Sequence, residues 1–391
     1  MDALMLPLNW QRVKLGDIAT FLKGKGLSKS QVSSNAKHEC ILYGELFTYY
    51  DRVITNIKNF TNIYNNPILS LSNDVLMPSS DVTPNGLATA SCILKEGVIL
   101  GGDILIIRPN SNLLSGRFLA YCIVCNKNQV LSKVVGSTVY HLYAKDLKDF
   151  EIPLPPLNEQ IAIANILSDV DRYLCALRAL ILKKESVKKA LSFELLSQRK
   201  RLRGFNQAWQ RVRLGDICEI VKGQQINKIS LNNTDKYPVI NGGIDFLGYT
   251  NKFNVSKNTI AISEGGTCGY VRFMKSDFWS GGHNYSLQKI SNKVNNLCLY
   301  HILKSYEKDI MKLGVGSGLK NIQLKALKDF EILLPPLNEQ IAIANILSAL
   351  DNEIISLKNK KRQFENIKKA LNHDLMSAKI RVLKKINFIT K

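Results

Sequence analysis

The chain has 391 residues, of which 45% are hydrophobic and 22% charged, as in a globular protein of two or three domains. With only 24 glycines and 11 prolines, it is neither collagenous nor low in complexity. The formal net charge of +21 at pH 7 favours a polyanionic partner, most commonly nucleic acid, although a generally basic proteome would also produce it.

The N-terminus and the apolar runs give no sign of export or membrane insertion. The first residues, MDALMLPLNWQR, lack the basic start and the uninterrupted apolar core of a signal peptide. The longest apolar runs fall far short of the roughly 20 residues that a membrane helix needs. We therefore expect a cytoplasmic protein. The eight cysteines are scattered, and Cys122 and Cys125 form the one CxxC pair, so we expect reduced thiols and no metal site.

The sequence is an internal repeat. The segment WQRVKLGDI at 10–18 returns 199 residues later at 209–217, with one change from Lys14 to Arg213. The segment LKDFEIPLPPLNEQIAIANILS at 147–168 returns 180 residues later at 327–348, with one change from Pro153 to Leu333. The chain is therefore two tandem copies of one unit, and the first copy carries 19 extra residues between about residues 20 and 100.

Each copy begins with a globular part. Short apolar runs alternate there with clusters of Gly, Asn, Pro and Ser, which is typical of strands and loops. The predicted strands lie at 75–80, 97–100 and 103–109 in the first copy and at 237–240, 259–263 and 269–273 in the second. One amphipathic stretch per copy, 113–131 and 296–312, predicts a helix. The fold class we expect is α+β, with two tandem globular α/β domains.

A long helix follows each globular part. The pairs Pro155-Pro156 and Pro335-Pro336 end the preceding strand, because proline cannot continue a regular ladder. Asn158 and Asn338 follow where an N-cap is favoured, and the next residue, a glutamate, faces the positive end of the helix dipole. The predicted boundaries are 1–155 for the first domain, 156–203 for the first helix, 204–335 for the second domain, and 336–385 for the second helix with a basic tail.

Apolar residues recur in these helices at alternating steps of three and four, which predicts a heptad seam. The seam residues are Leu167, Val170, Leu174, Leu177, Ile181, Leu191 and Leu195 in the first copy, and Leu347, Leu350, Ile354, Leu357, Phe364, Ile367, Leu371 and Leu375 in the second. Helices of about 42 residues are about 60 Å long. We expect them to pair with each other as an antiparallel coiled coil, so that the chain has approximate two-fold symmetry. The alternative is that each packs only on its own domain.

One exchange supports the pairing. The first helix has Ile181 and Lys184 where the second has Lys361 and Phe364, so an apolar and a basic residue change places and the two seams would complement each other. Two similar basic domains at the ends of such a pair resemble the two half-site readers of a dimeric repressor, which lie about 34–36 Å apart along DNA. Because residues 20–100 and 219–280 differ between the copies, we expect an asymmetric, bipartite target.

These motifs resemble a known family. The order W..V.LGDI, a variable middle, LPPLNEQ and a long helix, all occurring twice, is similar to the specificity subunit of type I restriction-modification enzymes, and the resemblance covers essentially the whole chain. It implies two target recognition domains that bind double-stranded DNA, and spacer helices that set the distance between the half-sites. It also implies two adenine-N6 methyltransferase subunits bound along those helices, and restriction (motor and nuclease) subunits that join for cleavage.

The resemblance further implies a subunit without catalytic activity. S-adenosylmethionine, ATP and Mg²⁺ are then expected on the partner subunits and no cofactor on this chain. The sequence agrees, since it has no GxxxxGK[ST] loop for ATP and no Asn/Asp-Pro-Pro-aromatic quartet of an adenine methyltransferase. A coiled-coil interaction scaffold that does not bind DNA is the alternative, which the net charge disfavours. An autonomous restriction enzyme is a third.

The candidate DNA-binding residues are polar side chains on loops, which can neutralise phosphates or contact base edges. In the first copy they are Lys23, Lys25, Ser79, Ser80, Thr83, Asn85, Ser137, Thr138, Tyr140, His141 and Lys145. In the second copy they are Lys222, Gln224, Gln225, Asn241, Ser263, Gly265, Gly266, Thr267, Tyr270, His283, Asn284, Ser317, Lys320 and Asn321. SEGGTCGY at 263–270 is equally typical of a tight turn. The basic ends at 199–203 and 379–385 either bind phosphates or stabilise helix C-termini.

Overall fold

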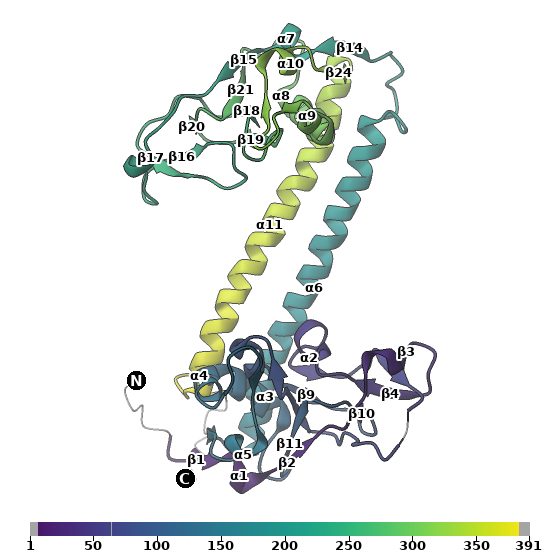
Figure 1. Cartoon of the computed structure of the whole chain (residues 1–391), viewed down its shortest axis with the longest axis vertical. Coiled ribbons are helices and arrows are strands. Elements are labelled where there is room, and N and C mark those ends of the chain that lie inside the picture. The colour runs from purple at the N-terminus through teal and green to yellow at the C-terminus, as the bar shows by residue number, and fades with distance from the viewer. Residues whose placement is uncertain (1–6, 64, 383–391) are drawn as a thin grey trace, which may run out of the picture. The chain divides into compact units, whose positions relative to one another are not determined.

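The computed structural model describes residues 7–63 and 65–382. The chain divides into two compact units, Met1–Arg178 with Asn359–Lys391, and Ala179–Lys358. Each unit therefore holds one globular domain and half of each long helix (Figure 1). The basic end predicted at 379–385 lies outside the described residues beyond position 382. In the part of the chain that is described, no helix is both long and apolar enough to cross a membrane.

The first domain is built on a five-stranded sheet of order β2-β11-β7-β9-β5. A four-stranded sheet, β10-β4-β6-β3, and two pairs, β1-β13 and β12-β8, complete it. The strands are β1 (Gln11–Lys14), β2 (Ala19–Lys23), β3 (Val32–Ser33), β4 (His38–Ile41), β5 (Val53–Ile54), β6 (Asn59–Thr61), β7 (Val75–Pro78), β8 (Ser80–Asp81), β9 (Ser91–Ile93), β10 (Ile99–Leu100), β11 (Ile104–Pro109), β12 (Tyr140–His141) and β13 (Glu151–Leu154). The helices are α1 (Leu15–Ile18), α2 (Glu45–Thr48), α3 (Gly116–Cys125), α4 (Lys127–Leu131) and α5 (Ala144–Leu147), with 3-10 turns at Lys29–Gln31 and Pro84–Ala88.

Both faces of this sheet are covered. Alternate residues of a strand point to opposite faces. Val75 and Met77 of β7 join the core formed with α3, whereas Leu76 joins a second core with Ile41 and Leu100 of the four-stranded sheet. This explains why β7 and β11 are almost continuously apolar, a pattern that an antiparallel strand shows only when neither face meets water.

The second domain repeats the plan with fewer strands. Its main sheet has the order β15-β21-β18-β19, beside β17-β16-β20 and the pairs β14-β24 and β22-β23. The strands are β14 (Gln210–Arg213), β15 (Glu219–Lys222), β16 (Tyr237–Ile240), β17 (Gly248–Thr250), β18 (Thr259–Ser263), β19 (Val271–Met274), β20 (Trp279–Ser280), β21 (Asn284–Gln288), β22 (Gly314–Val315), β23 (Asn321–Ile322) and β24 (Glu331–Leu334). The helices are α7 (Leu214–Ile217), α8 (Asn296–Ser305), α9 (Glu307–Lys312) and α10 (Leu324–Lys328), with a 3-10 turn at Lys228–Ser230.

Each helix predicted at 113–131 and 296–312 is broken in two. The first breaks at Asn126, whose side-chain amide donates to the carbonyl of Cys122 and so competes with the helical ladder. The second breaks at Tyr306.

The two long helices are continuous. They are α6 (Leu157–Leu196) and α11 (Leu337–Met376), each of 40 residues and about 60 Å long. Each begins one residue before the asparagine expected as its N-cap, so Asn158 and Asn338 lie in the first turn instead. The helices also end earlier than predicted, at Leu196 and Met376, and two residues further on Gln198 and Ala378 take positive φ angles of 61° and 57°. The Lys200 N–H then donates to the Glu194 carbonyl, closing a C-terminal cap without glycine.

Within each unit, the two helix halves pair antiparallel through the same contacts. Arg178 pairs with Glu365 in the first unit at 3.5 Å, and the equivalent Lys358 pairs with Glu185 in the second at 2.6 Å. Asp171 with Lys368, and Asp351 with Lys188, form a second equivalent set. The recurrence of these pairs establishes one register for both units. The chain is thus an antiparallel coiled coil carrying two α/β domains.

The exchange between the seams has a different basis from the one predicted. Lys184 does not complement Phe364. It pairs with Glu353 at 2.8 Å, while Phe364 packs on Tyr173 with 4.6 Å between ring centroids. These two contacts occupy equivalent positions, so an ion pair in one unit replaces an aromatic pair in the other.

The seam residues divide into two groups. Leu174, Leu177, Ile181 and Ile354 are buried outside both domain cores. Residues near the helix ends belong instead to those cores, namely Leu167, Leu371 and Leu375 in the first domain and Leu191 and Leu347 in the second. Leu195 is buried, and Val170, Leu350, Leu357 and Phe364 are half-buried. The prediction for Ile367 is wrong, since it is 51% exposed and Lys368 occupies the seam in its place.

His301 of α8 is buried against α11, where its Nε2 lies 3.3 Å from the Ser348 hydroxyl. Burial lowers the pKa of His301 to about 4, with nearby Lys188 acting in the same direction and Asp351 opposing it. Folding therefore favours the neutral imidazole. The contribution of His301 to the free energy of unfolding is complete above pH 6.5, the pKa of the unfolded state, and declines as the pH falls toward 4.

We expect the free energy of unfolding of the second unit to fall by about 2 kcal/mol between pH 7 and pH 5 through this histidine. Urea denaturation of wild type and His301→Gln across that range measures it. The variant should show a flatter dependence, because glutamine does not titrate. Parallel pH dependences for the two proteins would contradict the assignment.

Candidate nucleic-acid interface

In the second domain, polar loops meet at one end of the main sheet. Glu264 follows β18 and is 9% exposed. Its carboxylate accepts hydrogen bonds from Lys222 Nζ, at the end of β15, at 2.7 Å, and from the Tyr285 hydroxyl at 3.1 Å. Burial and the adjacent carboxylate raise the pKa of Tyr285 to about 12, so the phenol keeps its proton. Glu264 thus ties together three strands beneath the loops.

Two glycine-containing loops are clamped above this carboxylate. The Glu264 N–H donates to the His283 carbonyl, and the Thr267 N–H donates to the Gly242 carbonyl, both at 2.8 Å. Asn241 accepts from the His283 N–H at 3.0 Å. Gly242 and Gly266 have φ angles of 79° and 70°, where a side chain would be strained. The two loops are therefore held against each other with their polar edges exposed.

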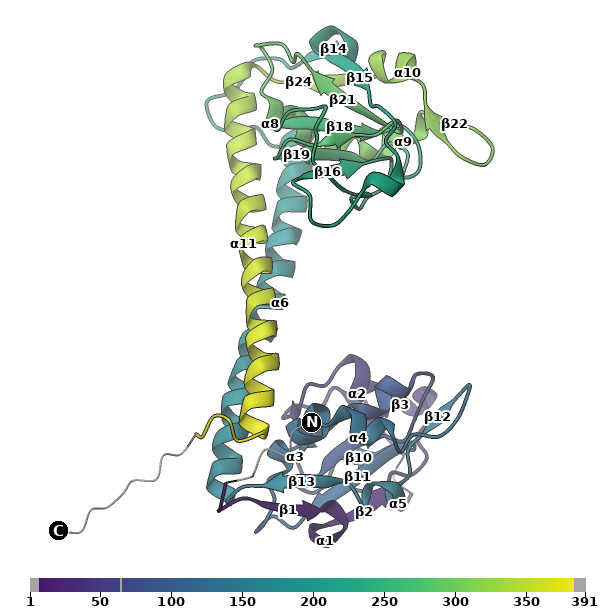
Figure 2. The same cartoon turned by 90° about the vertical axis from the view of Figure 1, so that its left-hand side faces the viewer.

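A hairpin projects beside these loops. Strands β22 and β23 pair, and the Ile322 N–H donates to the Glu264 carbonyl at 2.9 Å. The tip carries Ser317, Lys320 and Asn321, all exposed, and Figure 2 shows it extending away from the sheet. With exposed Gln224, Gln225 and His283, these side chains form one polar surface, which we call the second-domain loop cluster.

Four candidates in this domain do not face outward. Ser263 and Asn284 are 3% and 2% exposed and contact each other inside the domain. Gly265 is also buried, under Asn321. Tyr270 is turned toward α8, with Lys304 Nζ 4.2 Å from its ring centroid. Ser263 and Asn284 therefore help to hold the loops, and the expectation that these four residues contact DNA stays a prediction.

The first domain has a corresponding cluster with different chemistry. Lys23 occupies the position of Lys222, but it pairs with Asp103 at 3.2 Å. Ser79 donates to the same carboxylate at 3.3 Å and is buried, which corrects its assignment as a surface contact. Strand β8 pairs with β12, so that Ser80 lies opposite His141.

The exposed members of the first-domain loop cluster come from three segments. Ser137 and Thr138 lie at the tip of the hairpin ending in β12, Thr83 and Asn85 lie at the 3-10 turn after β8, and Lys145 lies on α5. Tyr140 and His141 are half-buried. Lys25 is directed elsewhere, because its Nζ donates to the Asn66 carbonyl at 3.2 Å. The two domains therefore share the arrangement of sheet and loops but expose different polar side chains on those loops.

Sequence reasoning missed the central carboxylates, Asp103 and Glu264. It searched the loops for cations and amides, whereas the residues that position the lysines are acidic. An acidic residue directly beside a strand of apolar residues, as in DILIIRP and TIAISE, was the available signal.

The LPPLNEQ motif holds each long helix to its domain. Gln160 accepts from the Ser115 N–H and donates to the Pro155 carbonyl, and Gln340 accepts from the Asn295 N–H and donates to the Pro335 carbonyl. Glu339 is 1% exposed and accepts from the Trp209 indole at 3.0 Å. The motif is therefore a docking element.

The same glutamates bind arginines from the basic ends. Arg201 donates two hydrogen bonds of 2.7 Å to Glu339, and Arg381 donates to Glu159 at 2.6 and 2.9 Å. The guanidinium groups of both arginines are thus engaged by these carboxylates. They attach the segment after one long helix to the start of the other.

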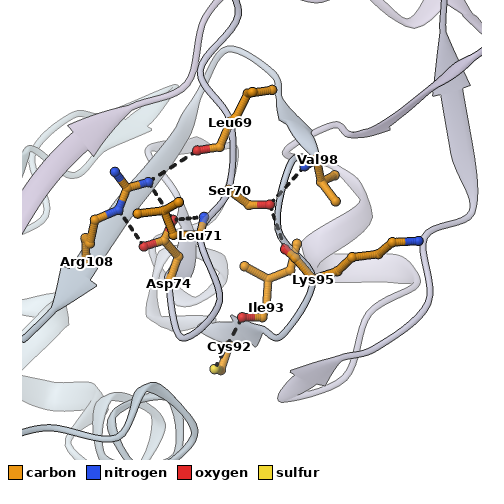
Figure 3. A network of polar contacts seen from close by, with 9 residues as sticks. All are labelled: Leu69, Ser70, Leu71, Asp74, Cys92, Ile93, Lys95, Val98 and Arg108. Carbon is orange, nitrogen blue, oxygen red and sulfur yellow. Dashed lines mark hydrogen bonds and ion pairs between the residues drawn. The ribbon is translucent and has the colours of Figure 1, made fainter. Parts of the chain in front are cut away.

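Another polar network of the first domain lies at the other end of β7 and is structural (Figure 3). Arg108 donates two 2.8 Å hydrogen bonds to the buried carboxylate of Asp74, which raises the pKa of Arg108. Ser70 bridges the carbonyl of Lys95 and the N–H of Val98. The hydrogen bonds of this network join neighbouring loops, which is a structural role.

Five of the eight cysteines are buried, Cys125 and Cys268 are half-buried, and Cys175 is exposed. Burial raises the pKa of Cys122 and of Cys125, which disfavours the thiolate that binds metals. Among residues 7–63 and 65–382, no group of His, Cys, Asp or Glu side chains is arranged to hold a metal ion.

Comparison with known proteins identifies the family to which the chain is similar. The family model described as the type I restriction modification DNA specificity domain matches residues 7–185 and 206–366. Two relatives are specificity subunits of type I restriction enzymes from Methanocaldococcus jannaschii. The MjaX subunit is 31% identical over 73% of this chain and 73% of its own. The MjaVIII subunit is 26% identical over 99% of this chain and 96% of its own. A type I specificity subunit of Mycoplasma pneumoniae is 38% identical over 40% of this chain, a match spanning 44% of that relative.

A solved structure shares the fold. The crystal structure of a type I restriction-modification S subunit from M. genitalium has a TM-score of 0.74 at 21% identity and covers 95% of this chain and 98% of its own. The chain therefore belongs to a class of proteins in which two tandem α/β domains are joined by an antiparallel pair of long helices. Within that class, the two matches to the family model show that the chain belongs to the type I restriction-modification DNA specificity family.

Proposed function

We propose that this chain is the DNA specificity subunit of a type I restriction-modification system and that it recognises an asymmetric, bipartite target. The observation that carries the proposal is the pair of loop clusters. Each occupies the same position on its domain, and each presents different side chains, as two readers of unlike half-sites require. The net charge of +21 supports DNA as the ligand.

Family membership supports the partners and the cofactors that we propose. Two adenine-N6 methyltransferase subunits would bind along α6 and α11, and restriction subunits would join them, bringing S-adenosylmethionine, ATP and Mg²⁺. This chain would supply recognition without catalysis. We expect the purified chain alone to transfer no methyl group and cleave no DNA, whereas an autonomous restriction enzyme would do one or both.

A salt titration of duplex binding tests the DNA-binding role. If the clusters and neighbouring lysines neutralise about six phosphates, the logarithm of the association constant should fall linearly with the logarithm of salt concentration, with a slope of about −5. Affinity should drop about 1000-fold between 50 and 200 mM salt. An interaction scaffold that does not bind DNA would show little duplex affinity at any salt concentration.

Substitution of a single lysine at the hairpin tip tests whether DNA binds at the second-domain loop cluster. We expect Lys320→Ala to weaken duplex binding several-fold and to reduce the salt slope by about one, because a phosphate contact is lost. Lys293→Ala is the matched control, since Lys293 is exposed in the turn before α8, away from the loop cluster. Equal effects of the two substitutions would contradict the proposed surface.

A further inference from the structure

The second unit has a groove between its domain and its own helix segments. Two adjoining hollows of about 650 Å³ and about 830 Å³ share His301, Asp351 and Ile355 as lining residues, so they form one groove. Phe273 and Lys275 border one end and Lys304 and Lys308 the other. None of these residues belongs to the second-domain loop cluster.

The first unit has the same groove, but its own chain occupies it. Equivalent helix residues line both sites: Asp171, Leu174, Arg178, Glu365 and Lys368 in the first unit, and Asp351, Ile354, Lys358, Glu185 and Lys188 in the second. The hollow in the first unit is only about 260 Å³, and Asp51 and Arg52 complete its lining. Both immediately precede β5, an edge strand that has no counterpart in the main sheet of the second domain.

That segment enters the groove as an added strand. β5 pairs parallel to β9, with the Cys92 N–H donating to the Arg52 carbonyl at 2.9 Å and the Leu94 N–H donating to the Ile54 carbonyl at 3.0 Å. Arg52 is half-buried there, and its guanidinium donates to the Ala90 carbonyl at 2.8 Å. The first unit thus shows what fits such a groove: an extended strand with polar side chains at its leading end.

The second domain leaves the equivalent edge open. β19 is the last strand of its sheet within the described residues, and the registers align Phe273 with Cys92. Since the Ser263 N–H donates to the Tyr270 carbonyl, the alternating ladder turns the main-chain groups of Val271 and Phe273 away from β18. The main-chain N–H of Val271 donates to the Glu307 carboxylate, and its carbonyl accepts from Lys304 Nζ. The open edge therefore begins at Phe273, where the groove also begins.

The charge of the groove selects the occupant. Lys188 and Lys358 are paired with the groove's own Asp351 and Glu185. Lys189, Lys308 and Lys275 add positive charge to the same lining, which favours an acidic side chain on the bound segment. Asp51 holds the comparable place in the first unit.

We propose that β19 and this groove are a docking site for an extended segment of a protein partner. The segment adds to β19 as a parallel strand, as β5 does to β9, and places an acidic side chain among the lysines while apolar residues follow along the edge. Main-chain hydrogen bonds give such strand addition its affinity, and the groove gives it specificity.

The test uses a labelled synthetic peptide of residues 50–57, YDRVITNI, as the probe and the full chain as the receptor. Fluorescence anisotropy should show saturable binding that a scrambled peptide does not reproduce. Hydrogen exchange read by mass spectrometry should slow in the fragment containing β19. Ile355→Glu should weaken binding at least tenfold, since Ile355 lines both hollows.

Ile341→Glu is the matched control, because Ile341 lies on the same helix with 40% exposure against 47% for Ile355, outside the groove. It should bind the peptide as wild type does. No saturable binding, equal binding of the scrambled peptide, or unchanged exchange at β19 would overturn the proposal. A further outcome would also overturn the proposal: duplex DNA displaces the peptide equally from wild type and from the Ile341→Glu variant. The groove would then be a site for a phosphate backbone.

Discussion

Removing one heptad from each long helix should shorten the unread spacer of the DNA target by about three base pairs and leave both half-sequences unchanged. The deletions are residues 177–183 of α6 and 357–363 of α11, which face each other in the register given by the Arg178–Glu365 and Glu185–Lys358 pairs. Seven helical residues span about 10 Å, and one base pair spans about 3.4 Å. The connection between the domains becomes shorter, while neither loop cluster is changed.

The measurement is a map of N6-methyladenine in cells that supply the partner subunits. The matched control replaces each deleted heptad by an unrelated one with the same apolar positions, and it should leave the spacer unchanged. Deleting the heptad from α6 alone should abolish modification, because Asp171–Lys368 and Lys188–Asp351 could no longer both form. A map with altered half-sites and a constant spacer would contradict the role of the helices.

The architecture could be predicted because it depends on local and repeated signals. Apolar runs marked β7, β11, β16 and β18, and the two copies of LPPLNEQ marked the helix starts. Helix pairing followed from the seam. Its detailed chemistry did not, since Lys184 and Phe364 have separate partners on the facing helix that only the register reveals.

The candidate interface was predicted less completely, for a physical reason. Spacing along the chain identifies loops, but not which side of a loop faces solvent. Ser263 ends β18 and Asn284 begins β21 beside the polar loops, and both point inward, whereas Lys320 and His283 point outward. The central carboxylates bind residues more than 20 positions away, as Glu264 does with Lys222, and no periodicity encodes such a pair.

The anchors at the helix starts show the same limitation, and they predict the largest loss of stability. Arg201 and Glu339 are 138 positions apart, and the basic composition of RKRLR by itself favours phosphate binding or stabilisation of a helix C-terminus. In the structure, the Glu339 carboxylate accepts two hydrogen bonds from Arg201 and one from Trp209 while nearly sealed from water. Removing one partner of such a buried pair leaves the other without compensation, which costs about 3–5 kcal/mol.

We therefore expect Glu339→Gln to lower the free energy of unfolding of the second unit by about 3 kcal/mol in urea denaturation followed by tryptophan fluorescence. The matched control is Glu331→Gln, whose partner Arg211 is 70% exposed and whose loss should cost less than about 1 kcal/mol. Arg201→Met combined with Glu339→Gln should recover part of the loss, because neither residue then leaves a buried charge. Equal losses for Glu339→Gln and Glu331→Gln would show that the anchor is not what holds the segment after α6 to the start of α11.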